Sequence, residues 1–213
     1  MAPAVQKGVL MSTEKKKTGN KMSIRAITVT AMLSAVAFIL MFLDFSIPML
    51  IPGFIKMDLS ELPALIATFA FGPVSGICVC LIKNLIHLFI TSTGGVGELS
   101  NFLLGACFVL PAGLIYKAKK TKKRALIGAF TGAFAMGIAS IPINYFIIYP
   151  VYYNFMPKDV IVAAYQAILP SVKSILQCLV VFNAPFTAVK GIFSCIITCL
   201  IYKPLSPILK GRG

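Results

Sequence analysis

Residues 25–43 read RAITVTAMLSAVAFILMFL, a run in which the only charged residue is the first, Arg25. An α-helix rises about 1.5 Å per residue, so this run is long enough to cross a hydrocarbon core of about 30 Å. A signal peptide also has a basic flank and an apolar core, but this run is long and continues into DFSIP without a small-residue cleavage site. The stretch therefore predicts a membrane-spanning helix that is retained.

The composition of the whole chain extends that prediction. Of its 213 residues 58% are hydrophobic and 12% are charged, against about half and about a quarter in soluble domains. We therefore expect an integral membrane protein. No polar linker or repeat marks a second domain, so residues 22–213 are predicted to form one membrane domain, and the polar residues 1–21 a disordered cytoplasmic tail.

The net charge of +14 would point to nucleic acid if it lay on a soluble face. Instead the basic residues cluster beside apolar runs, as in cytoplasmic loops of membrane proteins. We therefore expect membrane lipid as a partner and no nucleic acid. The clusters are Lys15, Lys16, Lys17, Lys21 and Arg25; Lys117, Lys119, Lys120, Lys122, Lys123 and Arg124; and Lys203, Lys210 and Arg212.

The spans between these clusters define the expected fold class, an all-α bundle of six transmembrane helices. Six spans place every basic cluster, and both termini, on the cytoplasmic side. Asp58 and Glu61 have the spacing of a helix-capping pattern at the start of the second span. The expected spans are residues 25–43, 58–71, 74–91, 100–116, 125–149 and 175–202, the last loosened at Pro185. The loops 44–57, 91–100 and 150–174 then face outward, where an external ligand would bind.

A lysine interrupts the last span, in the stretch NAPFTAVKGIF at residues 183–193. Lys190 is expected about 20 Å from the cytoplasmic end of a helix, which is too far for its side chain to reach the surface on that side. A lysine at this depth costs a few kcal/mol unless it has partners or faces a water-filled cavity. It is either a structural charge held by helix-end carbonyls or a ligand-facing group, and we favour the second.

Polar neighbours support a ligand site. Thr187 and Asn183 continue one helical stripe from Lys190 toward the outside, and Asn144 lies at a comparable depth on the fifth span. Nearby aromatic residues would supply flat apolar walls: Tyr145, Phe146, Tyr149, Tyr152 and Phe186. The pattern favours a neutral, aromatic, hydrogen-bonding solute over an inorganic ion.

Three stretches together carry a resemblance to a known family: KMDLSELPALIATFAFGPVSG at 56–76, IKNLIHLFITSTGGVGELSNFLLG at 82–105 and NAPFTAVKG at 183–191. From residue 22 onward the chain resembles the riboflavin-specific S component of energy-coupling factor transporters. The resemblance implies a six-helix protein that captures riboflavin on the outer side. It would deliver the vitamin with a transmembrane coupling subunit of the EcfT type and two cytoplasmic ATPase subunits, and riboflavin would be cargo, with no cofactor.

The resemblance also implies site residues. Asn144, Thr187 and Lys190 match positions that hold the flavin in the family, although the family often has Asn where this chain has Thr187. A hydroxyl can still donate and accept a hydrogen bond. Asn183 and Tyr149 join them from the polar stripe and the aromatic walls. The loop between the first two spans would cover the ring through Leu43, Phe45, Ile47, Pro48 and Leu50.

Energy has to come from elsewhere, because the chain contains no G-x-x-x-x-G-K-[ST] motif. The TSTGGVGE stretch lacks the lysine, and Gly94, Gly95 and Gly97 are predicted to form a turn. Ala31 and Ala35 form a small-x-x-x-small face that suits either internal packing or a partner helix. S components use such a face against the coupling subunit, so the resemblance favours the partner.

Other polar residues within the spans have alternative interpretations. Lys83 and His87 lie one turn apart and suit either a proton relay or structural pairing with Asp58 or Glu61; we favour pairing. No metal-binding motif, paired acidic motif or nucleophile elbow suggests a membrane-embedded enzyme. The cysteines are expected to pack as small apolar residues. The alternative within transport is an S component for thiamin, biotin or a pteridine.

Overall fold

The computed structural model describes residues 22–91 and 93–210, and within these ranges it is all-helical, without a strand. The prediction of a disordered tail at residues 1–21 lies outside the described residues. The main helices are α1 (Ile24–Met41), α2 (Glu61–Phe71), α3 (Pro73–His87), α4 (Val96–Ala118), α5 (Lys122–Ile143) and α9 (Ala184–Lys210). Shorter elements join them: η1 (Leu88–Ile90), η2 (Asn144–Ile148), α6 (Tyr149–Tyr152), α7 (Lys158–Gln166), α8 (Ile175–Cys178) and η3 (Leu179–Asn183).

Five continuous helical segments are long and apolar enough to cross a membrane. They are Ile24–Met41, Pro73–Ile90, Val96–Ala118, Lys122–Tyr152 and Ile175–Ile201. The remaining predicted span, 58–71, corresponds to α2, which has 11 residues and therefore a length of only about 16 Å. Every residue of α2 from Glu61 to Phe69 is buried. This helix is therefore a central element that the others surround.

The predicted capping pattern at the start of α2 is wrong. The helix begins at Glu61, its N-cap is Ser60, and no side chain caps it. Asp58 instead accepts hydrogen bonds from the backbone N–H and the hydroxyl of Ser60, at 2.8 and 2.5 Å. Its second carboxylate oxygen is engaged by Lys190, so a tertiary charge partner has taken the group that the local pattern assigned to the helix end.

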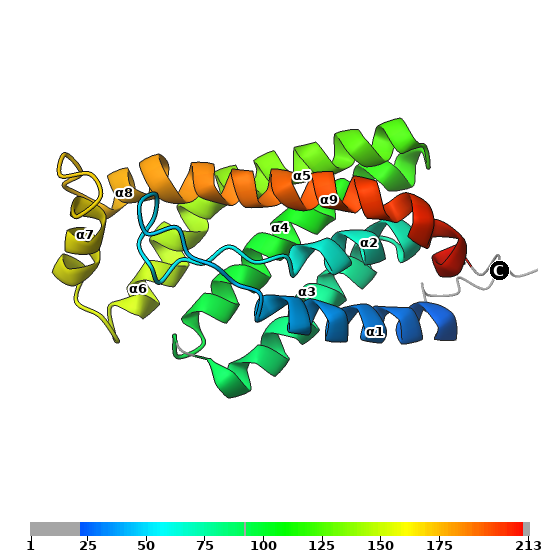
Figure 1. The fold of residues 1–213 in the computed structure, drawn as a ribbon, viewed down its shortest axis with the longest axis horizontal. Coiled ribbons are helices and arrows are strands. Elements are labelled where there is room, and N and C mark those ends of the chain that lie inside the picture. The colour runs from blue at the N-terminus through cyan, green and yellow to red at the C-terminus, as the bar shows by residue number, and fades with distance from the viewer. Residues whose placement is uncertain (1–21, 92, 211–213) are drawn as a thin grey trace, which may run out of the picture.

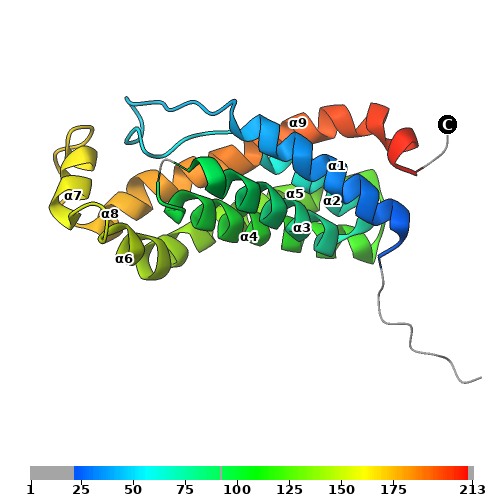
Figure 2. The same ribbon diagram turned by 90° about the horizontal axis from the view of Figure 1, so that it is seen from below.

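The turns between the helices lie at the two ends of the bundle (Figure 1). The first residues of α1, the Gly72 turn between α2 and α3, the α4–α5 turn and the end of α9 lie at one end. At Gly72 the backbone has φ +103°, which glycine adopts without strain. The segment 42–60, the turn before α4 and α7 lie at the other end, and Figure 2 shows the segment 42–60 extending beyond α1 toward α7.

Two of the long segments contain a π-helical turn just before a proline. The turn η2 precedes Pro150, and η3 precedes Pro185. Proline has no N–H for the carbonyl one turn earlier and its ring clashes with that carbonyl, so a wider turn relieves both problems. The predicted loosening near Pro185 is therefore present, as a π-helical turn at Leu179–Asn183.

Small residues bring α4 and α5 close together at the end away from the loops. A Cβ atom on Gly128 would lie 2.7 Å from the carbonyl oxygen of Ala112, closer than packed atoms allow.

In the region predicted as the loop 150–174 the structure has the additional helix α7, which buries Ile161 and Tyr165. The sequence prediction missed this helix because it is short and flanked by turn residues.

Candidate functional site

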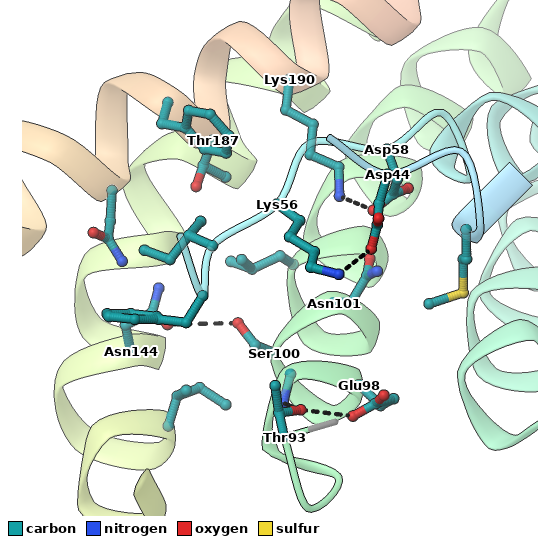
Figure 3. A pocket seen from close by; sticks show the side chains of 18 of the residues that line it. Asp44, Lys56, Asp58, Thr93, Glu98, Ser100, Asn101, Asn144, Thr187 and Lys190 are labelled. Carbon is teal, nitrogen blue, oxygen red and sulfur yellow. Dashed lines mark hydrogen bonds and ion pairs between the residues drawn. The ribbon is translucent and has the colours of Figure 1, made fainter. Parts of the chain in front are cut away.

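A cavity of about 720 Å³ lies at the loop end of the bundle, between the segment 42–58, α4, the α5–η2–α6 segment and α9. Figure 3 shows its polar side chains pointing inward from these elements. Five of the predicted ligand contacts line it and come together from segments far apart in the sequence: Asn144, Tyr149, Asn183, Thr187 and Lys190. The volume falls within the range of about 300–1,000 Å³ typical of small-molecule sites.

Lys190 forms an ion pair with Asp58 across the cavity wall. Its Nζ lies 2.8 Å from Oδ2 of Asp58, and the two side chains are 10% and 8% exposed. The carboxylate comes from the segment before α2, 132 positions away in the sequence. The partner of Lys190 is thus a carboxylate and not the helix-end carbonyls of the structural alternative, while the same side chain also lines the cavity.

Asp58 uses both of its carboxylate oxygens in this position. Oδ2 accepts from Lys190 at 2.8 Å, and Oδ1 accepts from the backbone N–H and the hydroxyl of Ser60. A buried charge needs an opposite charge and hydrogen bonds of this kind. The cavity wall therefore carries a fixed pair of opposite charges.

A second buried lysine lies behind this pair. Lys83 is fully buried, and its Nζ lies 2.9 Å from Oε1 of Glu61, 2.5 Å from Oγ of Ser60 and 3.4 Å from Oδ1 of Asn101. The predicted structural pairing of Lys83 is confirmed, with Glu61 as its carboxylate. Because Ser60 also donates to Asp58, the two lysines belong to one connected network.

His87 does not join Lys83. Its Nδ1 lies 2.7 Å from Oε1 of Glu98, which is in the first turn of α4. Thr91 and Thr93 donate hydroxyl hydrogen bonds to the other oxygen of Glu98, at 2.9 and 3.1 Å. His87, Thr93 and Glu98 line the cavity, and this cluster around Glu98 was not predicted from the sequence.

The predicted turn before α4 explains how that cluster forms. Gly94 and Gly95 have φ of +63° and +87°, so the chain reverses tightly there. The reversal directs the threonines of residues 91 and 93 back toward Glu98. Gly97 already belongs to α4. The signal in the sequence was Glu98 itself, three residues after a glycine pair at a helix start.

Asn144 presents an acceptor to the cavity. Its Nδ2 donates to the backbone carbonyl of Ser140 at 2.7 Å, which fixes the side-chain amide. Its Oδ1 receives a long hydrogen bond from the hydroxyl of Ser100 at 3.5 Å. The oxygen therefore keeps most of its capacity to accept a hydrogen bond from a bound molecule.

Several predicted contacts lie elsewhere. The predicted ring-covering residues do not line the cavity, and Leu43, Phe45 and Leu50 are among the exposed apolar side chains. Ile47 and Pro48 do not line the cavity either. The segment lines the cavity through other residues instead: Phe42, Asp44, Gly53, Phe54, Ile55, Lys56 and Asp58.

The aromatic walls are smaller than predicted. Tyr149, Tyr152 and Phe186 line the cavity, whereas Tyr145 and Phe146 point outward and line a separate hollow. Phe146 is 72% exposed. The sequence pattern listed aromatic residues without assigning them to faces, and the helix brings only some of them to the cavity.

Ala31 and Ala35 are both exposed on α1, while Ser34 beside them is buried. Internal packing, the alternative for this small-residue face, does not fit two exposed alanines. Exposed apolar residues continue the same surface, among them Ile27, Met32 and Ile39.

Comparisons with known proteins agree on a family. A family model described as "ECF transporter, substrate-specific component" matches residues 25–202. The chain is 37% identical to the riboflavin transporter RibU of Staphylococcus aureus (strain TCH60), covering 92% of this chain and 97% of that protein. It is 33% identical to the riboflavin transporter FmnP of Bacillus subtilis (strain 168), covering 87% and 94%. A solved structure of the S component of a bacterial ECF transporter superposes with a TM-score of 0.69 at 35% identity, covering 87% of this chain and 98% of that one.

Proposed function

Because the chain belongs to the family of substrate-specific components of ECF transporters, we propose that it captures riboflavin on the outer side and passes it inward with a coupling subunit and two ATPase subunits. The chain is a multi-pass protein of the bacterial cell membrane, and it is a transporter subunit and not an enzyme. The observation that supports riboflavin as the ligand is the chemistry of the cavity. The similarity of the chain to two riboflavin transporters adds to it.

A flavin needs two kinds of surface at once. Its tricyclic ring is flat and apolar, while its ring edge and ribityl chain need donors and acceptors. In the cavity, Tyr149, Tyr152 and Phe186 supply aromatic surface. Asn144, Asn183, Thr187 and Lys190 supply polar groups within the same walls, and we assign them as the flavin contacts.

The segment between α1 and α2 acts in this proposal as a cover. Leu43, Phe45, Ile47, Pro48 and Leu50 would close over the ring. The support is that this segment lies at the cavity end and carries exposed apolar side chains, with Leu43 59% and Leu50 62% exposed. A backbone bridge between Phe45 and Met57 ties its two ends together.

The six-span topology also belongs to the proposal. We infer that α2 and residues 57–60 just before it together form the sixth crossing. Both termini are then cytoplasmic, and residues 22–213 act as one domain. The support is that the start of α1, the end of α9 and the basic α4–α5 turn share one end of the bundle (Figure 1). The positive-inside rule places that end in the cytoplasm.

The exposed face of α1 is the proposed contact with the coupling subunit. Ala31 and Ala35 would let a partner helix approach closely, because small side chains allow close packing in lipid. Both side chains are exposed on the surface of the described bundle, where a partner helix could reach them.

Riboflavin binding tests the proposal directly. The purified protein in mild detergent is titrated with riboflavin, whose fluorescence is followed for quenching. We expect saturable one-to-one binding by the wild type and weaker binding by Lys190→Ala. Since Lys190→Ala leaves Asp58 unpaired, the neutral double variant Asp58→Asn/Lys190→Met separates loss of the ligand contact from an uncompensated charge.

Lys173→Met is the control, because Lys173 is an exposed lysine that does not line the cavity. Loss of riboflavin binding in both Lys190 variants, with near-normal binding in Lys173→Met, supports the assignment. Failure of folded wild-type protein to bind riboflavin would reject it, and thiamin, biotin and a pteridine would then be titrated in turn.

A further inference from the structure

Tyr165 contacts the cavity walls without lining the cavity. It lies on α7, outside the five candidate spans, and it is fully buried. Its hydroxyl hydrogen-bonds with the hydroxyl of Tyr149 and with the amide oxygen of Asn183, and its ring packs edge-on against Phe54 with centroids 6.1 Å apart. Those three neighbours do line the cavity. A residue on a surface helix thus touches three elements of the site from behind.

The hydrogen bonds among these residues form a closed ring. Tyr165 donates to Oδ1 of Asn183 at 2.6 Å, and Nδ2 of Asn183 donates to the hydroxyl of Tyr149 at 3.4 Å. Each tyrosine hydroxyl has one hydrogen, so Tyr149 must donate to Tyr165, at 2.5 Å. The 2.6 Å contact is typical of O–H···O and shorter than the usual N–H···O distance of about 2.9 Å. The distances therefore place the amide oxygen, and not the nitrogen, toward Tyr165.

This arrangement fixes what Asn183 offers to the cavity. Its oxygen is occupied by a short hydrogen bond from Tyr165, whereas one hydrogen of Nδ2 makes a long contact and the other has no partner among the described residues. Burial raises the pKa of the Tyr165 phenol, so this hydroxyl remains a donor throughout the physiological range. Asn183 is thus held as a donor, opposite in sense to the acceptor oxygen of Asn144.

We propose that Tyr165 is a positioning residue for ligand binding: its hydroxyl holds the amide of Asn183 so that Nδ2 donates to an acceptor atom of the bound molecule. The inference rests on the proposed riboflavin site and deepens it. Asn183 contacts the ligand, and Tyr165 acts through it. Without the hydroxyl, the amide rotates between two orientations, and one of them turns an acceptor toward the ligand's acceptor.

The test is a double-mutant cycle on riboflavin affinity in the full chain. Tyr165→Phe keeps the ring that packs on Phe54 and removes only the hydroxyl. We expect it to raise the Kd for riboflavin by about three- to tenfold, the usual effect of one hydrogen bond. Asn183→Ala should raise the Kd at least as much. In the Asn183→Ala background, Tyr165→Phe should change the Kd by less than about twofold, because the group it positions is absent.

Two controls separate positioning from folding. Tyr116→Phe removes a hydroxyl from a buried tyrosine far along α4 from the cavity, and it should leave the Kd unchanged. Thermal unfolding of the ligand-free variants is measured in parallel, because a purely structural role of Tyr165 lowers the Tm without coupling to Asn183 in Kd. Should Asn183→Ala fold poorly, Asn183→Leu fills a similar volume and completes the cycle.

The outcomes are distinct. If the wild type binds and Tyr165→Phe binds equally well, or loses as much affinity with Asn183→Ala as without it, the positioning role is overturned while riboflavin binding stands. If the folded wild type does not bind riboflavin, the proposed function fails and this inference fails with it. Coupling between Tyr165 and Asn183, with Tyr116→Phe unchanged, supports it.

Discussion

Lys83 and Lys190 are both buried and both paired with a carboxylate, but they lie in different surroundings. The Lys83–Glu61 pair is completely buried among α2, α3 and α4, with Ser60 and Asn101 as further partners. The Lys190–Asp58 pair has nearly the same length, 2.8 against 2.9 Å, yet it lines the cavity and keeps slight exposure. The two pairs are joined through Ser60.

The difference teaches that pairing alone does not distinguish a structural charge from a ligand-facing one. A buried ion pair contributes little net stability over apolar residues, but removing one partner leaves a charge that cannot be hydrated. Lys83 and Glu61 are fully buried and do not line the cavity, so water cannot readily replace a lost partner there. Around Lys190 the cavity lets water do so, and the same substitution should mainly affect what enters the cavity.

The largest effect is expected from Lys83→Met. It leaves the side chain of Glu61 fully buried without its cationic partner, and we expect a loss of about 3–5 kcal/mol in the free energy of unfolding. Thermal unfolding in detergent, with and without riboflavin, would measure the loss. The double variant Lys83→Met/Glu61→Gln removes both charges and should recover a large part of it. If the single variant is as stable as the wild type, the contrast between the two lysines is wrong.

Lys190→Met should destabilise the protein less. Water in the cavity can hydrate the unpaired Asp58, so we expect a loss of about 1–3 kcal/mol, together with a larger proportional loss of ligand affinity. Comparing the Tm of ligand-free Lys190→Met with that of Lys83→Met measures the contrast. Equal losses would show that access to the cavity does not soften the cost.

The smallest effect is expected from Lys56→Ala. Lys56 and Asp44 pair at 2.7 Å, but their side chains are 47% and 32% exposed. Exposed pairs contribute about 0.2–1 kcal/mol. The Tm should shift by less than for either buried lysine, and high salt should leave the shift unchanged or reduce it. A loss comparable to that of Lys190→Met would mean that the edge of the cavity is less hydrated than its exposure indicates.

Much of the fold follows from local patterns. The first predicted span, 25–43, became α1 at Ile24–Met41, because an apolar run of this length satisfies its own backbone as a helix. The glycine pair at residues 94 and 95 was correctly predicted as a turn. The start of α2 was not, since Asp58 fits a local cap but is drawn to a lysine 132 positions away.

The candidate site divides in the same way. Apolar surroundings made Lys190 anomalous in the sequence, and one helical stripe linked it to Thr187 and Asn183, all of which line the cavity. The position of Tyr165 behind the cavity had no sequence signal, because a tyrosine in a short segment between two spans looks like any other loop residue. The packing of α7 against the long helical segments buries it and brings its hydroxyl to Asn183.

The sequence by itself determined that this chain crosses the membrane, where its basic ends lie along the chain and which side chains are costly to bury, because these depend on hydration and on the period of a helix. The tertiary structure alone decided which carboxylate pairs with which lysine and which aromatic residues face the cavity. Those outcomes depend on how each helix is rotated about its axis and on which distant segments approach one another.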